Sequence, residues 1–202
     1  MKLFDISQAR PLDWGFTSDI SLAALIQKGT INGLGKALTD FGQKYPTHVF
    51  QYVEVFGRLK ILEMVIDKND HRKMRLTMNS ISKYQNNGPF GNRVIAVRRC
   101  SLYDDAALRA IANDRHLRRW ADGQTWYDVP ELFSFIFGNK NDPNKFVCSS
   151  EAEDELNKDG FTFTDFPLER QDGLVPPYGI MNAQFAHNHS GIKYPITTIW
   201  QA

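Results

Sequence analysis

The amino-acid sequence predicts an α+β fold, in which a small sheet packs against helices. Two apolar, β-branched runs at residues 47–56 and 59–67 are separated by a glycine-containing turn, which is the pattern of a β-hairpin. Residues 104–119 carry apolar side chains at helical spacing, and residues 148–156 have helical character. A chain of 202 residues is long enough to bury one core without disulfide staples.

We expect a single domain over residues 1–202, with an irregular segment at residues 1–16 and a divergent tail at residues 180–202. Near the N-terminus, a capping pair at Ser18 and Asp19 precedes an apolar pattern that predicts a helix. The elements expected next are a helix at residues 34–41, strands at 47–56 and 59–67, a charged loop at 67–75, and a short strand at 74–81. A turn at residues 86–92 and a strand at 93–98 follow.

The second half of the chain is predicted to be mainly helical before it becomes irregular. Residues 104–119 are predicted to form a helix with two aspartates at its start. Residues 129–137 are predicted to form another helix, with Pro130 in its first turn. The helix at residues 148–156 ends near Gly160. From Phe161 onward the sequence is rich in proline, glycine and aromatic residues, and no element is assigned there.

Composition excludes several classes of function. The net charge of +1 gives no overall field that would attract nucleic acid or an anionic membrane. The glycine-rich residues 29–36 lack the spacing of a phosphate-binding loop, so no nucleotide site is predicted. Two cysteines cannot form a disulfide framework or a four-cysteine zinc site, although nothing forbids a Cys100–Cys148 pair. We predict no cofactor and no metal, and the sequence does not define an oligomeric state.

The predicted location is cytoplasmic by default, with other routes of export left open. The first residues contain no long apolar region of a signal peptide. No stretch approaches the 18 apolar residues of a transmembrane helix. The expected partner is a substrate, with no nucleic acid and no membrane span.

Cys148 is the first candidate for a catalytic residue. It ends a short apolar run and begins a helix with an acidic face. The positive end of a helix dipole favours the thiolate, which is the nucleophilic form of cysteine. The alternative is a packing role, because free cysteines are among the most buried residue types.

A cysteine nucleophile needs a nearby base, and His48 is the best placed of the five histidines. It begins an apolar strand, so a rigid scaffold could present its ring to a cleft. His71 and His116 lie in charged surroundings and are expected to be solvated. His187 and His189 form a His-x-His pair, but no convincing acidic or cysteine partner stands at ligand spacing.

The third member of the site depends on the hairpin register. Side chains alternate along a strand, so His48 and Phe50 share one face. With a two-residue loop at residues 56–57, Glu63 lies opposite Phe50 and one diagonal step, about 7–8 Å between Cα atoms, from His48. With the loop at residues 57–58, Asp67 lies opposite His48 instead. Glu63 is preferred because an acid in an apolar run is costly to bury without a partner.

These blocks resemble one known family. They are Thr47, His48 and Val49, then Glu63 on the returning strand, then residues 94–98, then Gly123, Tyr127 and Asp128, then Cys148 and Ser149. Their order is similar to the circularly permuted NlpC-type papain-like proteins, which include the bacterial YiiX-like and YaeF-like proteins and lie near lecithin retinol acyltransferase. In this group the histidine strand precedes the cysteine helix. The resemblance covers roughly residues 17–180.

The resemblance implies a papain-like fold and a cysteine hydrolase that acts on amide bonds, such as cell-wall peptide links, through a thiol acyl-enzyme. Cys148 would be the nucleophile, His48 the base and Glu63 the residue that orients His48. Tyr127 matches a family tyrosine, for which a site-wall or hydrogen-bonding role and a packing role are equally open. Arg98 matches a family arginine and is interpreted as structural.

The chain also departs from the family. Ser150 stands where the family often has glutamate, and Phe50 is bulkier than the small residue often found two positions after the histidine. These differences leave the substrate open. A thiol acyltransferase or esterase acting on lipid acyl groups is one alternative. A non-enzymatic binding or phage-associated structural protein that keeps the fold is another.

Overall fold

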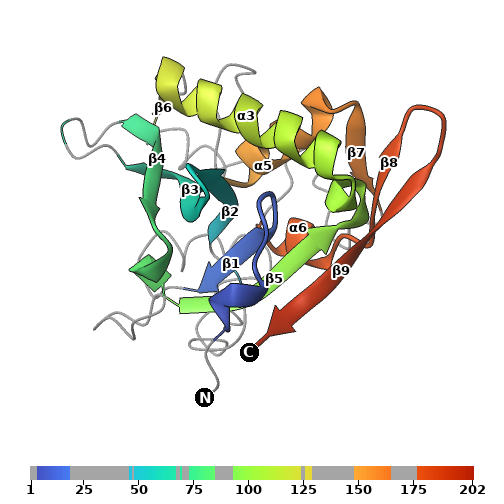
Figure 1. Ribbon diagram of the computed structural model, residues 1–202, viewed down its shortest axis with the longest axis horizontal. Coiled ribbons are helices and arrows are strands. Elements are labelled where there is room, and N and C mark those ends of the chain that lie inside the picture. The colour runs from blue at the N-terminus through green and yellow to red at the C-terminus, as the bar shows by residue number, and fades with distance from the viewer. Residues whose placement is uncertain are drawn as a thin grey trace, which may run out of the picture.

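The computed structural model describes residues 4–18, 46, 48–66, 69, 73–84, 93–123, 126–128, 148–164 and 177–202. Over these residues it confirms the α+β class, with nine strands joined in one sheet and helices packed against it (Figure 1). The spatial order of the strands is β6-β4-β3-β2-β1-β5-β9-β8-β7, and every described pair of neighbours is antiparallel.

The strands are β1 (Trp14–Ser18), β2 (His48–Val55), β3 (Arg58–Ile66), β4 (Lys73–Ser80), β5 (Arg93–Cys100), β6 (Trp126–Asp128), β7 (Phe161–Thr164), β8 (Phe185–Asn188) and β9 (Lys193–Gln201). The α-helices are α3 (Ala106–Asp122), α5 (Cys148–Lys158) and α6 (Pro177–Asn182). The described residues also form the 3-10 helices η1 (Ile6–Gln8), η2 (Ile81–Tyr84) and η3 (Ser101–Asp104).

The β2–β3 hairpin has the register that favours Glu63. Val55 pairs with Arg58, so Phe56 and Gly57 form the two-residue loop. Both loop residues have positive φ, 49° and 71°, as a type I′ turn requires. The tight turn is therefore at residues 56–57, and the alternative at residues 57–58 is wrong.

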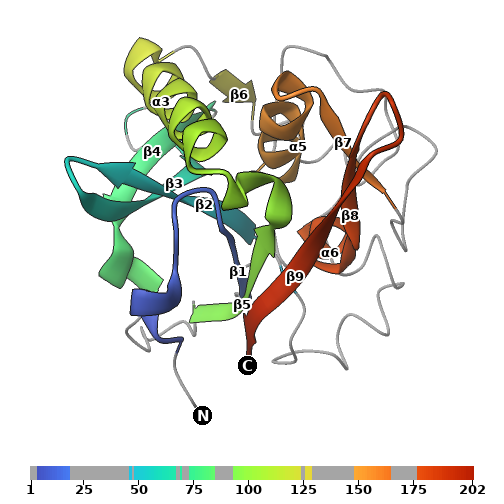
Figure 2. The same cartoon turned by 45° about the vertical axis from the view of Figure 1, so that its right-hand side comes forward.

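The sheet has two covered faces. The inner face carries Val49, Val53 and Leu62, which pack in one core with residues of α3 and α5. The outer face carries Phe50, Tyr52 and Ile61, which form a second, smaller core with residues near η1 and with η2. Helix α5 contacts β2 and β3 on one side and β7 at the far edge of the sheet, so the sheet curves around this helix (Figure 2).

The expectation of an irregular segment at residues 1–16 is wrong in part. β1 begins at Trp14 and lies between β2 and β5 at the centre of the sheet. Gly15 lies within this strand, and the Phe50 ring lies directly over its backbone. A Cβ atom added to Gly15 would lie 2.1 Å from Phe50 Cζ. Glycine therefore admits the aromatic ring at this position.

Of the tail that the sequence left unassigned, the described residues 161–164 and 177–202 form β7, α6, β8 and β9 with short connections. β8 and β9 form a hairpin, and β9 pairs with β5. The buried Arg98 guanidinium on β5 donates to the backbone carbonyls of Met181, Ala183 and Ile196. These contacts fasten the end of α6 and the strand β9 to β5, in agreement with a structural interpretation of Arg98.

The two described long helices agree with their predictions. Asp105 caps α3 by accepting from the backbone N–H groups of Ala107 and Leu108, and Gly123 ends the helix with φ 62°. α5 begins at Cys148 and extends two residues past the predicted end. Helices expected near residues 20–26, 34–41 and 129–137, the glycine-rich residues 29–36 and the turn at 86–92 lie outside the described residues. None of the described helices has the length and apolar character needed to cross a membrane.

Candidate functional site

The structure brings His48 and Glu63 together. His48 is the first residue of β2, and Glu63 on β3 lies one position beyond the Gln51–Leu62 pair, in line with Phe50. His48 Nε2 is 2.9 Å from Glu63 Oε2. The imidazole side chain is 15% exposed and the carboxylate is fully buried. This is the diagonal contact that the register predicts.

Glu63 is the centre of a polar cluster on the outer face of the sheet. Its Oε2 also accepts from the Tyr84 hydroxyl at 2.5 Å. Its Oε1 accepts from Asn79 Nδ2 at 2.8 Å and from Lys83 Nζ at 2.6 Å. Both carboxylate oxygens are therefore saturated with donors, which compensates for the cost of burying the group.

These contacts keep Glu63 ionised. Burial opposes the charge, but the hydrogen bond to His48, the attraction of the imidazolium when His48 is protonated, and the positive charge of Lys83 outweigh it and lower the pKa of Glu63 to about 2. A carboxylate accepts hydrogen bonds and does not donate them. Nε2 of His48 therefore carries the proton of the neutral ring, and Nδ1 carries the lone pair.

Cys148 is the first residue of α5, as the sequence predicts, but its side chain lies outside what the structure describes. α5 buries Ala152 and Leu156 against the inner face and contacts β2. Strand alternation places His48 with Phe50 on the outer face. A contact between Cys148 and His48 would therefore form at the end of β2, where His48 is the terminal residue.

The other predicted residues fall in separate places. Tyr127 lies on β6 and pairs with Met74 of β4, with its side chain outside the described part. Asp67, the reserve for the third member, and His71 lie outside the described residues. His187 Nδ1 and Nε2 are each 3.3 Å from the Thr162 hydroxyl on the neighbouring strand β7. His189 is exposed at the β8–β9 turn.

Cys100 is the other cysteine of the chain. It is a free thiol at the end of β5, fully buried in the inner core. Burial, with a smaller contribution from Asp104, raises the pKa of the Cys100 thiol to about 11. Cys100 is therefore a packing residue that stays protonated at neutral pH.

The prediction that His116 is solvated is wrong. Its side chain is fully buried between α3 and α5, although the residues around it in sequence are charged. Burial lowers the pKa of His116 to about 4. Its Nε2 is 3.5 Å from Glu155 Oε2, but neither ring nitrogen has a hydrogen-bond partner among the described residues. Arg115 and Arg119 face the same junction but pair with carboxylates near the end of α5, which leaves the His116 ring enclosed, and sequence composition does not reveal this enclosure.

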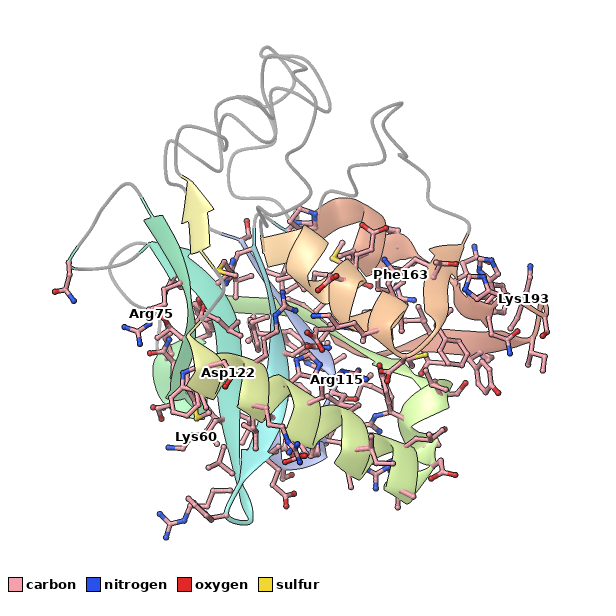
Figure 3. All side chains as sticks on the ribbon, turned by 90° about the horizontal axis from the view of Figure 1, so that it is seen from above. Lys60, Arg75, Arg115, Asp122, Phe163 and Lys193 are labelled. Atoms are coloured by element: carbon pink, nitrogen blue, oxygen red, sulfur yellow. The ribbon has the colours of Figure 1, made fainter. Side chains whose placement is uncertain are left out.

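Glu155 forms a second buried ionic cluster between the two helices. It pairs with Arg115 and Arg119 of α3, and with Lys158 one turn along α5. In Figure 3, Arg115 lies between α3 and α5, where it also pairs with Asp159 at 2.7 Å. Burial opposes the charge of Glu155, but His116, Arg119 and Lys158 outweigh it and lower its pKa to about 2.

Sequence reasoning missed Asn79, Lys83 and Tyr84. Asn79 pairs with Ile61, two positions from Glu63 along the sheet, so strand alternation would have found it once the β3–β4 register was known. Lys83 and Tyr84 belong to the 3-10 helix η2 after β4. No sequence pattern aims a short 3-10 helix at a particular strand residue.

A scan against protein-family models finds no match for the chain, and no curated protein sequence matches it significantly. The resemblance to the permuted papain-like proteins therefore depends on the sequence blocks alone.

Proposed function

We propose that this protein is a papain-like cysteine hydrolase that cleaves amide bonds with Cys148 as nucleophile, His48 as base and Glu63 as the residue that orients the base. The observation that carries the proposal is the hydrogen bond between His48 Nε2 and the buried Glu63 carboxylate. It fixes the ring and leaves the lone pair on Nδ1, as a general base requires.

Three further features support the proposal. Cys148 begins α5, so the helix dipole favours its thiolate. α5 contacts β2, the strand that begins with His48. The partial exposure of His48 leaves the ring accessible from solvent.

In the first half of the reaction, Cys148 Sγ transfers its proton to His48 Nδ1 and attacks the carbonyl carbon of the substrate. The oxyanion is stabilised by the backbone N–H of Cys148, because the first N–H groups of a helix have no intrahelical acceptor. The tetrahedral intermediate then collapses. The C–N bond breaks, and His48 returns the proton to the leaving amine.

In the second half, water attacks the thioester carbonyl while His48 Nδ1 accepts its proton. The C–S bond breaks, a carboxylic acid is released, and His48 returns the proton to the Cys148 thiolate, which restores the starting site. Glu63 keeps its charge throughout and stabilises the imidazolium that forms in both halves. If an alcohol or amine replaces water, the same steps give acyl transfer, so the lipid acyl alternative differs in substrate rather than in machinery.

The experiment is alkylation by iodoacetamide, with peptide mass spectrometry to assign each modified cysteine. Cys100 serves as an internal control, because its buried thiol has a raised pKa. We expect Cys148 to react at neutral pH at least ~10²-fold faster than Cys100, and His48→Ala to slow Cys148 by about the same factor.

A non-enzymatic protein that keeps the fold makes the opposite prediction. Slow alkylation of Cys148 that His48→Ala does not change would overturn the proposed function. A panel of peptide amides and acyl esters, tested against Cys148→Ser, then separates amide hydrolysis from acyl transfer.

A further inference from the structure

We propose that Lys83 and Tyr84 of η2 are positioning residues that hold the Glu63 carboxylate in the orientation that serves His48. The inference rests on the proposed function and extends its site beyond the three predicted residues. It assigns a role to a short 3-10 helix that lies away from α5 in the sequence.

The division of donors between the two carboxylate oxygens is the first argument. Tyr84 and His48 share Oε2, at 2.5 and 2.9 Å, whereas Lys83 and Asn79 share Oε1, at 2.6 and 2.8 Å. A carboxylate held on both oxygens cannot rotate about its last bond without breaking contacts on each side. The oxygen that faces His48 is therefore fixed.

The second argument is that Tyr84 is itself held rigidly. Its ring stacks on Phe50 with centroids 5.2 Å apart and an interplanar angle of 20°. Phe50 in turn lies over the backbone of Gly15 on β1. A continuous packed row thus connects the central strand β1 to the hydroxyl that binds Glu63. Catalytic groups act best when such a supporting layer locks their rotamers.

The third argument concerns charge. Among the described residues, the groups that face Glu63 are His48 from β2, Asn79 from β4, and Lys83 and Tyr84 from η2. Lys83 brings a positive charge, and its Nζ lies 5.0 Å from the centre of the Tyr84 ring. Its side chain is 35% exposed, so it could remain fully hydrated but reaches the buried oxygen instead. The carboxylate is thus kept ionised while His48 changes its protonation.

The test uses three variants, Tyr84→Phe, Lys83→Met and Lys83→Arg, in the full chain. Two matched controls remove a tyrosine hydroxyl and a lysine ammonium that contact other carboxylates. Tyr103→Phe removes a hydroxyl that donates to Asp159, and Lys158→Met removes an ammonium that pairs with Glu155. Urea unfolding confirms that each variant is folded.

The first readout is independent of the thiol. The Nε2–H proton of His48 is followed by NMR, and the side-chain carboxyl carbon of Glu63 is titrated. We expect the Nε2–H signal to move upfield or broaden in Tyr84→Phe and Lys83→Met, and to stay unchanged in both controls. Lys83→Met raises the Glu63 midpoint by about one pH unit, and Lys83→Arg restores it.

The second readout is the rate of Cys148 alkylation against pH. We expect a roughly tenfold loss in Tyr84→Phe, the size typical for a lost supporting hydrogen bond. In Lys83→Met the loss of a positive charge near His48 favours the protonated imidazole, so the acid side of the rate profile moves to higher pH while Glu63 remains ionised.

The outcomes separate the two proposals. If Cys148 of the parent protein is unreactive, the proposed function fails, while the NMR signals still decide whether Lys83 and Tyr84 fix the His48–Glu63 pair. If Cys148 is reactive but all variants match their controls in both readouts, the positioning role is overturned. If Tyr84→Phe does not fold, Lys83→Met and Lys83→Arg alone test the positioning role. Lys83 is partly exposed, so we expect these two variants to fold.

Discussion

Glu63 is a residue whose type and position in the sequence indicate a site. An acid in an apolar strand is costly unless it is partnered, and four donors converge on it here. The hairpin loop at Phe56 and Gly57 sets the register, and the register brings the acid to His48. This part of the site could be predicted because it depends on one short-range turn.

Replacing Glu63 with glutamine tests the buried carboxylate directly. The amide keeps the size of the side chain but leaves Lys83 and His48 without their counter-charge. Because both partners retain some access to water, we expect a loss of about 2 kcal/mol in the free energy of unfolding, below the range for fully buried pairs. Urea unfolding at pH 7 measures it, with the exposed Glu54→Gln as control. A loss no larger than that of the control would contradict the proposed burial cost.

Gly15 is a second residue whose identity follows from a close contact. In Gly15→Ala, the new methyl group would occupy the position of the Phe50 ring, 2.1 Å from Cζ. Overpacking of this kind costs about 1–3 kcal/mol. We expect Phe50→Leu to relieve the clash, so the double variant is more stable than the sum of the two single changes allows. Additive losses in urea unfolding would mean that the two residues do not compete for the same space.

At the scale of elements, local patterns predicted β2, β3, β5, α3 and α5, because each is a periodic run bounded by a turn or cap. β1, β8 and β9 could not be predicted in this way. β1 lies between β2 and β5, and β9 pairs with β5, so both depend on partners distant in the sequence. η2 could not be predicted either, because no sequence pattern directs a short 3-10 helix to a particular strand residue, and Lys83 and Tyr84 were missed with it.

Arg98 makes an element-level prediction, because its guanidinium joins β5 to α6 and β9. Arg98→Met keeps the aliphatic stem but removes hydrogen bonds from a charged donor, each worth about 1.5–3 kcal/mol. We expect amide hydrogen exchange to quicken in α6, β8 and β9 and to remain slow in the β2–β3 hairpin.

Arg118 provides the matched control, since it is a surface arginine paired only within α3 among the described contacts. Arg118→Met should leave the exchange pattern as it is. Uniform acceleration across the sheet in Arg98→Met would show a general loss of stability instead of release of the C-terminal elements.

At the scale of the whole molecule, the sheet closes around α5, and α3 is joined to α5 through the Glu155 cluster. His116 is enclosed in this junction and is neutral in the folded protein above about pH 4, because burial lowers its pKa to about 4. In the unfolded chain its pKa is near the ordinary value of 6.5. Between these two values the unfolded state binds the extra proton, so stability falls as the pH falls.

We therefore expect the free energy of unfolding to decline from about pH 6.5 to pH 4, by on the order of 3 kcal/mol, through His116 alone. Glu63 and Glu155 act in a lower window. Their folded pKa values of about 2 lie below the ordinary 4.5, so their stabilisation is complete above pH 4.5 and is lost as the pH falls toward 2. Urea unfolding across this range resolves the two phases. His116→Gln should remove only the loss of unfolding free energy between pH 6.5 and pH 4. The exposed His189→Gln should change neither this loss nor the loss at lower pH. An upper phase that persists in His116→Gln would place the acid sensitivity outside the α3–α5 junction.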